Sequence, residues 1–138
     1  MMKKTRIAFA LSVGLFLSAE LGGNILSSDA FLWAAAPTHA LGLVAFVGID
    51  LLLITALWGG FRYAGTLCIV MAAVQFLAMA GDLAGLQPPS GMTASAFRNY
   101  LLGNILYVPL FALQPAIAAL GLLFRRNRHA SHLFPSFR

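Results

Sequence analysis

The chain alternates between long runs of apolar residues and short polar connections. Four runs are long enough to cross the hydrocarbon core of a bilayer as a helix, which takes about 20 residues, and they cover residues 7–26, 39–58, 63–84 and 99–124. The runs are continuous and rich in alanine and leucine, whereas a membrane β-barrel is built from short strands of alternating polarity. The pattern therefore predicts an all-α membrane protein, a four-transmembrane-helix bundle with short loops.

The connections between these runs are short and carry residues typical of turns and of the membrane interface, at residues 27–38, 59–62 and 85–97. Pro109 and Pro115 lie within the fourth run. Because proline has no backbone N–H to donate, these two residues predict a bend there. We expect a single transmembrane domain over residues 1–124, followed by a basic cytoplasmic tail over residues 125–138.

Composition excludes a water-soluble domain of ordinary type. Of the 138 residues, 60% are hydrophobic and only 9% are charged, compared with about 25% charged residues in soluble domains. The net charge is +5, and the basic residues gather near the two ends of the chain. We interpret this charge as a topology signal and as contact with lipid headgroups, rather than as a nucleic-acid surface. The candidate headgroup contacts are Lys3, Lys4, Arg6, Arg125, Arg126 and Arg128.

Orientation follows from the position of the basic residues. If the N-terminus is inside, the amino end, the 59–62 turn and the carboxyl tail hold three, one and four Lys or Arg residues, which is eight of the nine in the chain. Only Arg98 falls in an outer loop. The positive-inside rule then places both termini in the cytoplasm and the protein in the cell membrane as a multi-pass protein.

A cleaved signal peptide over residues 1–19 is the alternative for the first run, because a basic start, an apolar middle and a small residue at Ala19 fit such a signal. Cleavage would leave three helices. Leu17 fits the cleavage pattern poorly, however, and the apolar run continues to Leu26, which favours a retained helix.

Eight polar residues interrupt the apolar runs, where ionisable groups are costly. At about 100° per residue, Glu20 and Asn24 share one helix face, as do the pairs formed by His39 with Asp50 and by Gln75 with Asp82. The sequence therefore predicts a polar seam that faces the interior of the bundle, with Arg98 near its outer mouth. Its members are Glu20, Asn24, His39, Asp50, Gln75, Asp82, Asn104 and Gln114.

The seam has two interpretations. Its side chains can hydrogen-bond across helices and fix their register, or Glu20 and Asp50 can bind a cation or relay protons, with His39 as an outer proton acceptor. No catalytic motif is present, and a metal set of Glu20, His39 and Asp82 lacks the tight spacing of a convincing site. We therefore predict no cofactor and no metal.

Three functions remain open. The absence of a soluble domain and of a catalytic motif favours a non-catalytic structural or accessory subunit of a membrane complex. Its partners would be the lipid bilayer and other membrane subunits or a second copy. The alternatives are a small ion- or proton-coupled transporter that uses Glu20 and Asp50, and a membrane enzyme acting on lipid or quinone around His39, Asp82 and Arg98. The enzyme hypothesis predicts a ligand-sized pocket at the outer face.

Overall fold

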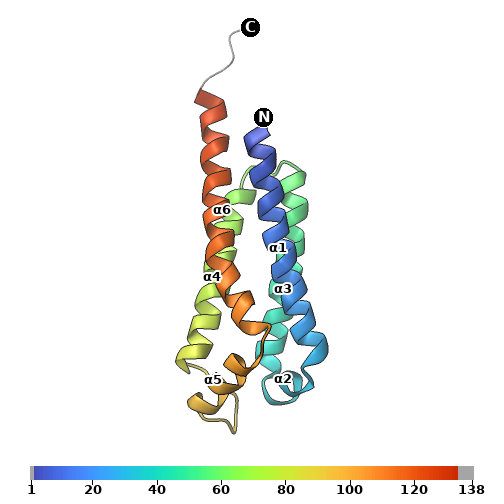
Figure 1. Ribbon diagram of the computed structural model, residues 1–138, viewed down its shortest axis with the longest axis vertical. Coiled ribbons are helices and arrows are strands. Elements are labelled where there is room, and N and C mark those ends of the chain that lie inside the picture. Colours follow the sequence, from blue (N-terminus) through green and yellow to red (C-terminus); the bar gives the residue numbers. More distant parts are fainter. Residues whose placement is uncertain (1, 134–138) are drawn as a thin grey trace.

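Figure 1 shows a computed structural model in which the backbone is described for residues 2–133 and the side chains for residues 3–127. Six helices follow one another along this part of the chain, with no strand among the described residues. They are α1 (Met2–Ser28), α2 (Ala30–Ala35), α3 (Pro37–Trp58), α4 (Ala64–Ala84), α5 (Ala94–Gly103) and α6 (Tyr107–Leu133). The predicted all-helical class is confirmed, and α1, α3, α4 and α6 are long and apolar enough to cross a membrane.

The helix expected over residues 99–124 is divided, and this expectation was wrong. Helix α5 ends at Gly103 and α6 begins at Tyr107, so three residues lie between them. Asn104 lies in the break, where its side-chain oxygen accepts a hydrogen bond from the backbone N–H of Leu106 at 3.0 Å. In a continuous helix Pro109 could not donate to the carbonyl of Ile105. The break places Pro109 in the first turn of α6, where no such donor is needed.

Helical structure also extends beyond two of the expected boundaries. Residues 27–38 are mostly helical, because α1 runs to Ser28 and α2 follows directly. Helix α6 continues to Leu133, so the first part of the expected tail, 125–138, is helical. The side chain of Arg128 lies outside the described residues.

The four long helices lie side by side (Figure 1). Helix α1 packs along α3 and α6, and α6 packs along α4, whereas α3 and α4 contact each other much less. The N-terminus and the α3–α4 turn lie at one end, here called the terminal end, and α2 and α5 lie at the other, here called the loop end (Figure 1). Helices α4 and α6 approach closely at Gly121, where an added Cβ would lie 2.9 Å from Ile69 Cγ1.

Two apolar clusters fill the interior. The first, toward the terminal end, includes Leu11, Leu15, Leu53, Leu57, Ile117 and Phe124. The second, toward the loop end, includes Ile25, Leu32, Met79, Phe97, Leu101 and Leu110. Asp29 caps α2 by accepting a hydrogen bond from the backbone N–H of Leu32 at 3.0 Å, and the Tyr100 hydroxyl of α5 donates to the same carboxyl. These two bonds hold α2 and α5 together over the loop end.

Candidate functional site

A chain of buried hydrogen bonds joins all four long helices. Gln75 Nε2 of α4 donates to Asp50 Oδ1 of α3 at 2.8 Å, and Gln114 Nε2 of α6 donates to Ser18 Oγ of α1 at 3.1 Å. The Ser18 hydroxyl also hydrogen-bonds to Asp50. The four side chains are at most 2% exposed. Because the alternative partner for each group would be apolar, this polar chain fixes the relative depth of the four helices.

The polar chain does not continue toward the terminal end. Most side chains packed on that side belong to the first apolar cluster, which includes Leu15, Leu53 and Ile117. A separate hydrogen bond, from Trp58 Nε1 to Ser12 Oγ at 2.9 Å, links α3 to α1 nearer the terminal end. The hydrogen bonds of Gln114 go to Ser18 and to the backbone carbonyl of Leu110, and none goes to Asp50. Ser18 lies between Gln114 and Asp50, so the two side chains are linked through a hydroxyl group.

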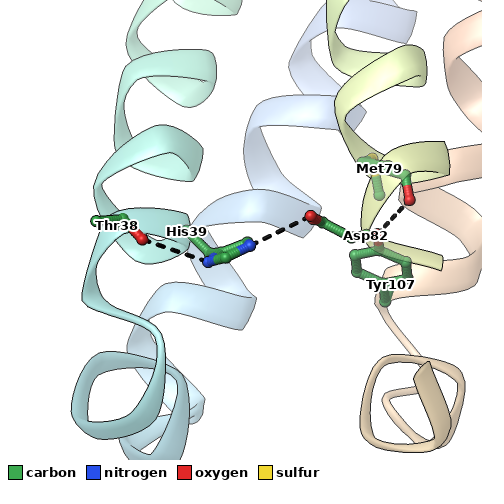
Figure 2. A network of polar contacts seen from close by, with 5 residues as sticks. All are labelled: Thr38, His39, Met79, Asp82 and Tyr107. Carbon is green, nitrogen blue, oxygen red and sulfur yellow. Dashed lines mark hydrogen bonds and ion pairs between the residues drawn. The ribbon is translucent and has the colours of Figure 1, made fainter. Parts of the chain in front are cut away.

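His39 of α3 and Asp82 of α4 form a second polar link, nearer the loop end. His39 Nε2 lies 3.2 Å from Asp82 Oδ1, and the two side chains are 20% and 22% exposed. Figure 2 shows the His39 ring pointing across to Asp82, with Thr38 on its other side. Thr38 Oγ1 lies 3.4 Å from His39 Nδ1. A neutral His39 that donates from Nε2 to Asp82 therefore has Nδ1 free to accept from Thr38.

Aromatic side chains hold the surroundings of this pair in place. The rings of His39 and Phe97 pack edge to face, with their centroids 5.2 Å apart. The hydroxyl of Tyr107, at the start of α6, donates to the backbone carbonyl of Met79 at 3.1 Å (Figure 2). The groups around the partly exposed His39–Asp82 pair thus come from α3, α4, α5 and α6.

A pocket of about 430 Å³ opens between α3 and α4, which contact each other much less than α1 contacts α3 or α4 contacts α6. His39 and Asp82 line it toward the loop end, and Gln75 lines it toward the middle of the protein. Most of the remaining lining is apolar and includes Leu43, Phe46, Leu77, Met79, Phe97 and Leu110. Sites for small molecules have volumes of about 300–1,000 Å³ and a mainly apolar wall with a few polar groups, and this pocket meets both criteria.

Acidic side chains and one histidine are among the ionisable groups along the pocket. Asp29 and Asp82 contribute carboxyl groups to its wall, and no Lys or Arg lines it among the described residues. Arg98, expected at the outer mouth, is instead exposed on α5 and absent from this lining. Asn104 does line the pocket, although it lies in the break before α6.

Glu20 and Asn24 do not face the interior. Both side chains are exposed on α1, and Asn24 Nδ2 lies 3.2 Å from Glu20 Oε1 within the same helix. Ser18 occupies the inward face, and Glu20 is about 200° away from it around the helix. The expectation of an inward Glu20 was therefore wrong. A metal set of Glu20, His39 and Asp82 is not brought together.

The basic residues near the chain ends occupy exposed positions. The described ones are Lys3, Lys4, Arg6, Arg125 and Arg126, all on parts of α1 and α6 at the terminal end (Figure 1). Their contact with lipid headgroups stays a prediction.

Several residues of the site were missed from the sequence, among them Ser18, Asp29 and Tyr100. Ser18 lies seven residues after the buried Leu11, so helical periodicity could have placed it on the same inward face of α1. Asp29 was read as part of a connection. Tyr100 gave no local signal, because its partner is 71 residues away in the sequence.

Comparison with known proteins gave no assignment: no protein family, curated protein or solved structure matches the chain. The site must therefore be interpreted from its own geometry.

Proposed function

We propose that this chain is a small multi-pass membrane protein that binds a lipid-soluble molecule in the pocket between α3 and α4. The observation that carries the proposal is the 430 Å³ pocket with an apolar wall and the His39–Asp82 pair at one end. An apolar wall lowers the free energy of an apolar ligand by removing it from water or lipid headgroups. The polar pair gives the ligand an orientation through hydrogen bonds.

The proposal places four helices across the cell membrane. The described basic residues at the chain ends favour a cytoplasmic terminal end by the positive-inside rule, so the pocket would lie near the outer surface. A binding protein of this size is compatible with the role of an accessory subunit.

The lining charges favour a particular class of ligand. An anionic headgroup would meet the carboxyl groups of Asp29 and Asp82 without any lysine or arginine among the described lining residues. Like charges at close range repel. We therefore propose an amphipathic ligand whose polar end is neutral or positively charged, with its apolar part against Leu43, Phe46 and Leu77.

The transporter hypothesis has less support from this geometry. Glu20, one of the two acids that this hypothesis requires, is exposed on the side of α1 that faces away from the other helices. Asp50, the other, is followed toward the terminal end by apolar side chains such as Leu53 and Leu57.

The test compares two glycines of the same helix. Gly42 lines the pocket and Gly48 does not, and a Cβ added at either position would meet no atom within 4 Å. Gly42→Leu should fill the pocket without disturbing the helix, and Gly48→Leu is the matched control. Cys68 is the one cysteine of the chain and is buried, so its reaction with a thiol-reactive dye during heating reports unfolding.

Each protein is melted in phosphatidylcholine nanodiscs with decanol, decylamine or decanoate. At 100 times the dissociation constant, a bound ligand stabilises the native state by about 2.7 kcal/mol. We expect decanol or decylamine to raise the melting temperature of the wild type and of Gly48→Leu, but not of Gly42→Leu. Equal shifts in the two glycine variants, or a shift with decanoate as large as with the other probes, would contradict the proposal.

A further inference from the structure

The outer face of α1 carries polar groups where a surface in contact with lipid would be apolar. This face, here called the Glu20 face, consists of Val13, Phe16, Leu17, Glu20, Gly23 and Asn24. Val13, Phe16 and Leu17 are 41%, 54% and 45% exposed, as is usual for a lipid-facing surface. Glu20 and Asn24 are also exposed, and their carboxyl and amide groups are not usual there.

Glu20 lies well inside the candidate membrane span, which covers Lys3–Ser28. At about 1.5 Å per residue it is about 12 Å from the end of the helix at Ser28. It is also only two residues from Ser18, which takes part in the polar chain through the middle of the protein. A charged side chain at the centre of a bilayer costs about 2.5–3.5 kcal/mol on insertion scales, so this position favours a polar neighbour over lipid.

The two polar groups of the face complement each other. Asn24 Nδ2 donates to the backbone carbonyl of Glu20 at 2.8 Å and makes a longer contact of 3.2 Å with the Glu20 carboxyl. A second carboxyl group brought alongside could replace that longer contact. The face therefore carries both a donor and an acceptor, which is the requirement for pairing with an identical face.

A second copy can also approach closely at this point. Gly23 lies between Glu20 and Asn24 on the same face, and a Cβ added there would meet no atom within 4 Å. Small residues permit two membrane helices to bring their backbones together, and interhelical hydrogen bonds then add to the attraction. Gly23 therefore leaves space beside the polar pair.

We propose that two copies of this chain associate through the Glu20 face as a parallel dimer. In this dimer each Asn24 amide donates to the Glu20 carboxyl group of the other copy, and a two-fold axis runs between the two α1 helices. The inference rests on the membrane location proposed above but not on ligand binding. Helix α1 packs on α3 and α6 and makes no contact with α4 among the described residues, so the dimer leaves the α3–α4 pocket open.

Cross-linking tests where the copies meet. A single cysteine is placed at Gly23 or at Val44 in a Cys68→Ala background, and the full chain in native membranes is oxidised with copper phenanthroline. Val44 is 44% exposed on α3 and lies outside the pocket lining. Counted from Ser18 and Asp50, which are in contact, the two positions differ in depth by only about 1.5 Å. We expect a disulfide-linked dimer with Gly23→Cys and at least tenfold less with Val44→Cys.

The polar pair is tested separately by counting subunits of single fluorescent complexes in nanodiscs. Glu20→Gln keeps an acceptor and should retain the dimer, whereas Glu20→Leu should weaken dimerisation at least tenfold. Melting with the Cys68-reactive dye shows whether the leucine variant is folded. Any of four results would overturn the proposal. They are a monomeric wild type, a Glu20→Leu variant that dimerises like the wild type, equal cross-linking at both cysteines, and a different protein bound to the Glu20 face. If the protein is monomeric, its melting temperature with decanol or decylamine would still test whether the pocket binds a ligand.

Discussion

The hydrogen bond between Asp50 and Gln75 can be measured as a coupling between two helices. The change is a double-mutant cycle with Asp50→Leu, Gln75→Leu and the combined variant. Both side chains are 2% exposed and 2.8 Å apart. Removing one partner leaves the other buried without its bond, which costs about 1–3 kcal/mol, whereas replacing both with apolar groups is much less costly.

The size of the coupling follows from the environment of the pair. Interhelical hydrogen bonds in membrane proteins contribute on average about 0.6 kcal/mol and at most about 1.7 kcal/mol. This bond is short and buried, and Asp50 is held by Ser18 as well, so we expect a coupling free energy in the upper half of that range. The double variant should therefore be more stable than the sum of the two single effects predicts.

The assay is equilibrium unfolding in mixtures of mild detergent and sodium dodecyl sulfate, followed by labelling of Cys68, which is fully buried in the native state. Val74→Leu, at a position beside Gln75 that is 44% exposed, is the control for adding an apolar side chain. A coupling free energy indistinguishable from zero would refute the reasoning, because it would mean that the bond does not link α3 to α4 energetically.

Two further predictions concern other contacts. Gly121→Ala should destabilise the protein by about 1–3 kcal/mol, because the new Cβ would lie 2.9 Å from Ile69 Cγ1. Gly48→Ala is the control and should not destabilise it, because a Cβ at Gly48 would meet no atom within 4 Å. The same unfolding assay compares the two variants. Burial, together with the hydrogen bond and charge of Asp29, raises the pKa of Tyr100. The stability linked to this residue is therefore full below about pH 10, its usual pKa, and is lost as pH rises above it. Tyr100→Phe should flatten this alkaline loss of stability, and an unchanged slope in pH-dependent melts would contradict the assignment.

The four long helices could be predicted from the sequence because their signal is local. A run of apolar residues needs no knowledge of its neighbours, and the run that contains Asp50 lies within α3. The break before α6 arises because a proline cannot donate the backbone hydrogen bond that a continuous helix would require. Pro109 indicated that the helix was perturbed, but the position of the break also depends on Asn104 and Leu106, whose hydrogen bond closes the turn.

The candidate site was predictable in part for a geometrical reason. Helical periodicity gives the angle between two residues of one helix, so it related His39 to Asp50 and Gln75 to Asp82. It does not say which side of the helix faces inward. The choice for α1 was made by packing, since Leu11 and Leu15 place Ser18 inside and leave Glu20 outside. The pocket itself depends on how far α3 separates from α4, which no single segment specifies.

The polar groups of the protein divide it into two halves with different physical roles. Between the terminal end and the Ser18–Asp50 contact, the interior is mainly an apolar cluster, with a closely packed α4–α6 crossing at Gly121 and one interhelical hydrogen bond from Trp58 to Ser12. Such close packing holds helices together. Between that contact and the loop end, the His39–Asp82 pair replaces direct packing of α3 on α4, and the pocket is the volume left between them. Because the buried polar chain fixes the four helices at the boundary, the loop half can hold this space open without loss of register.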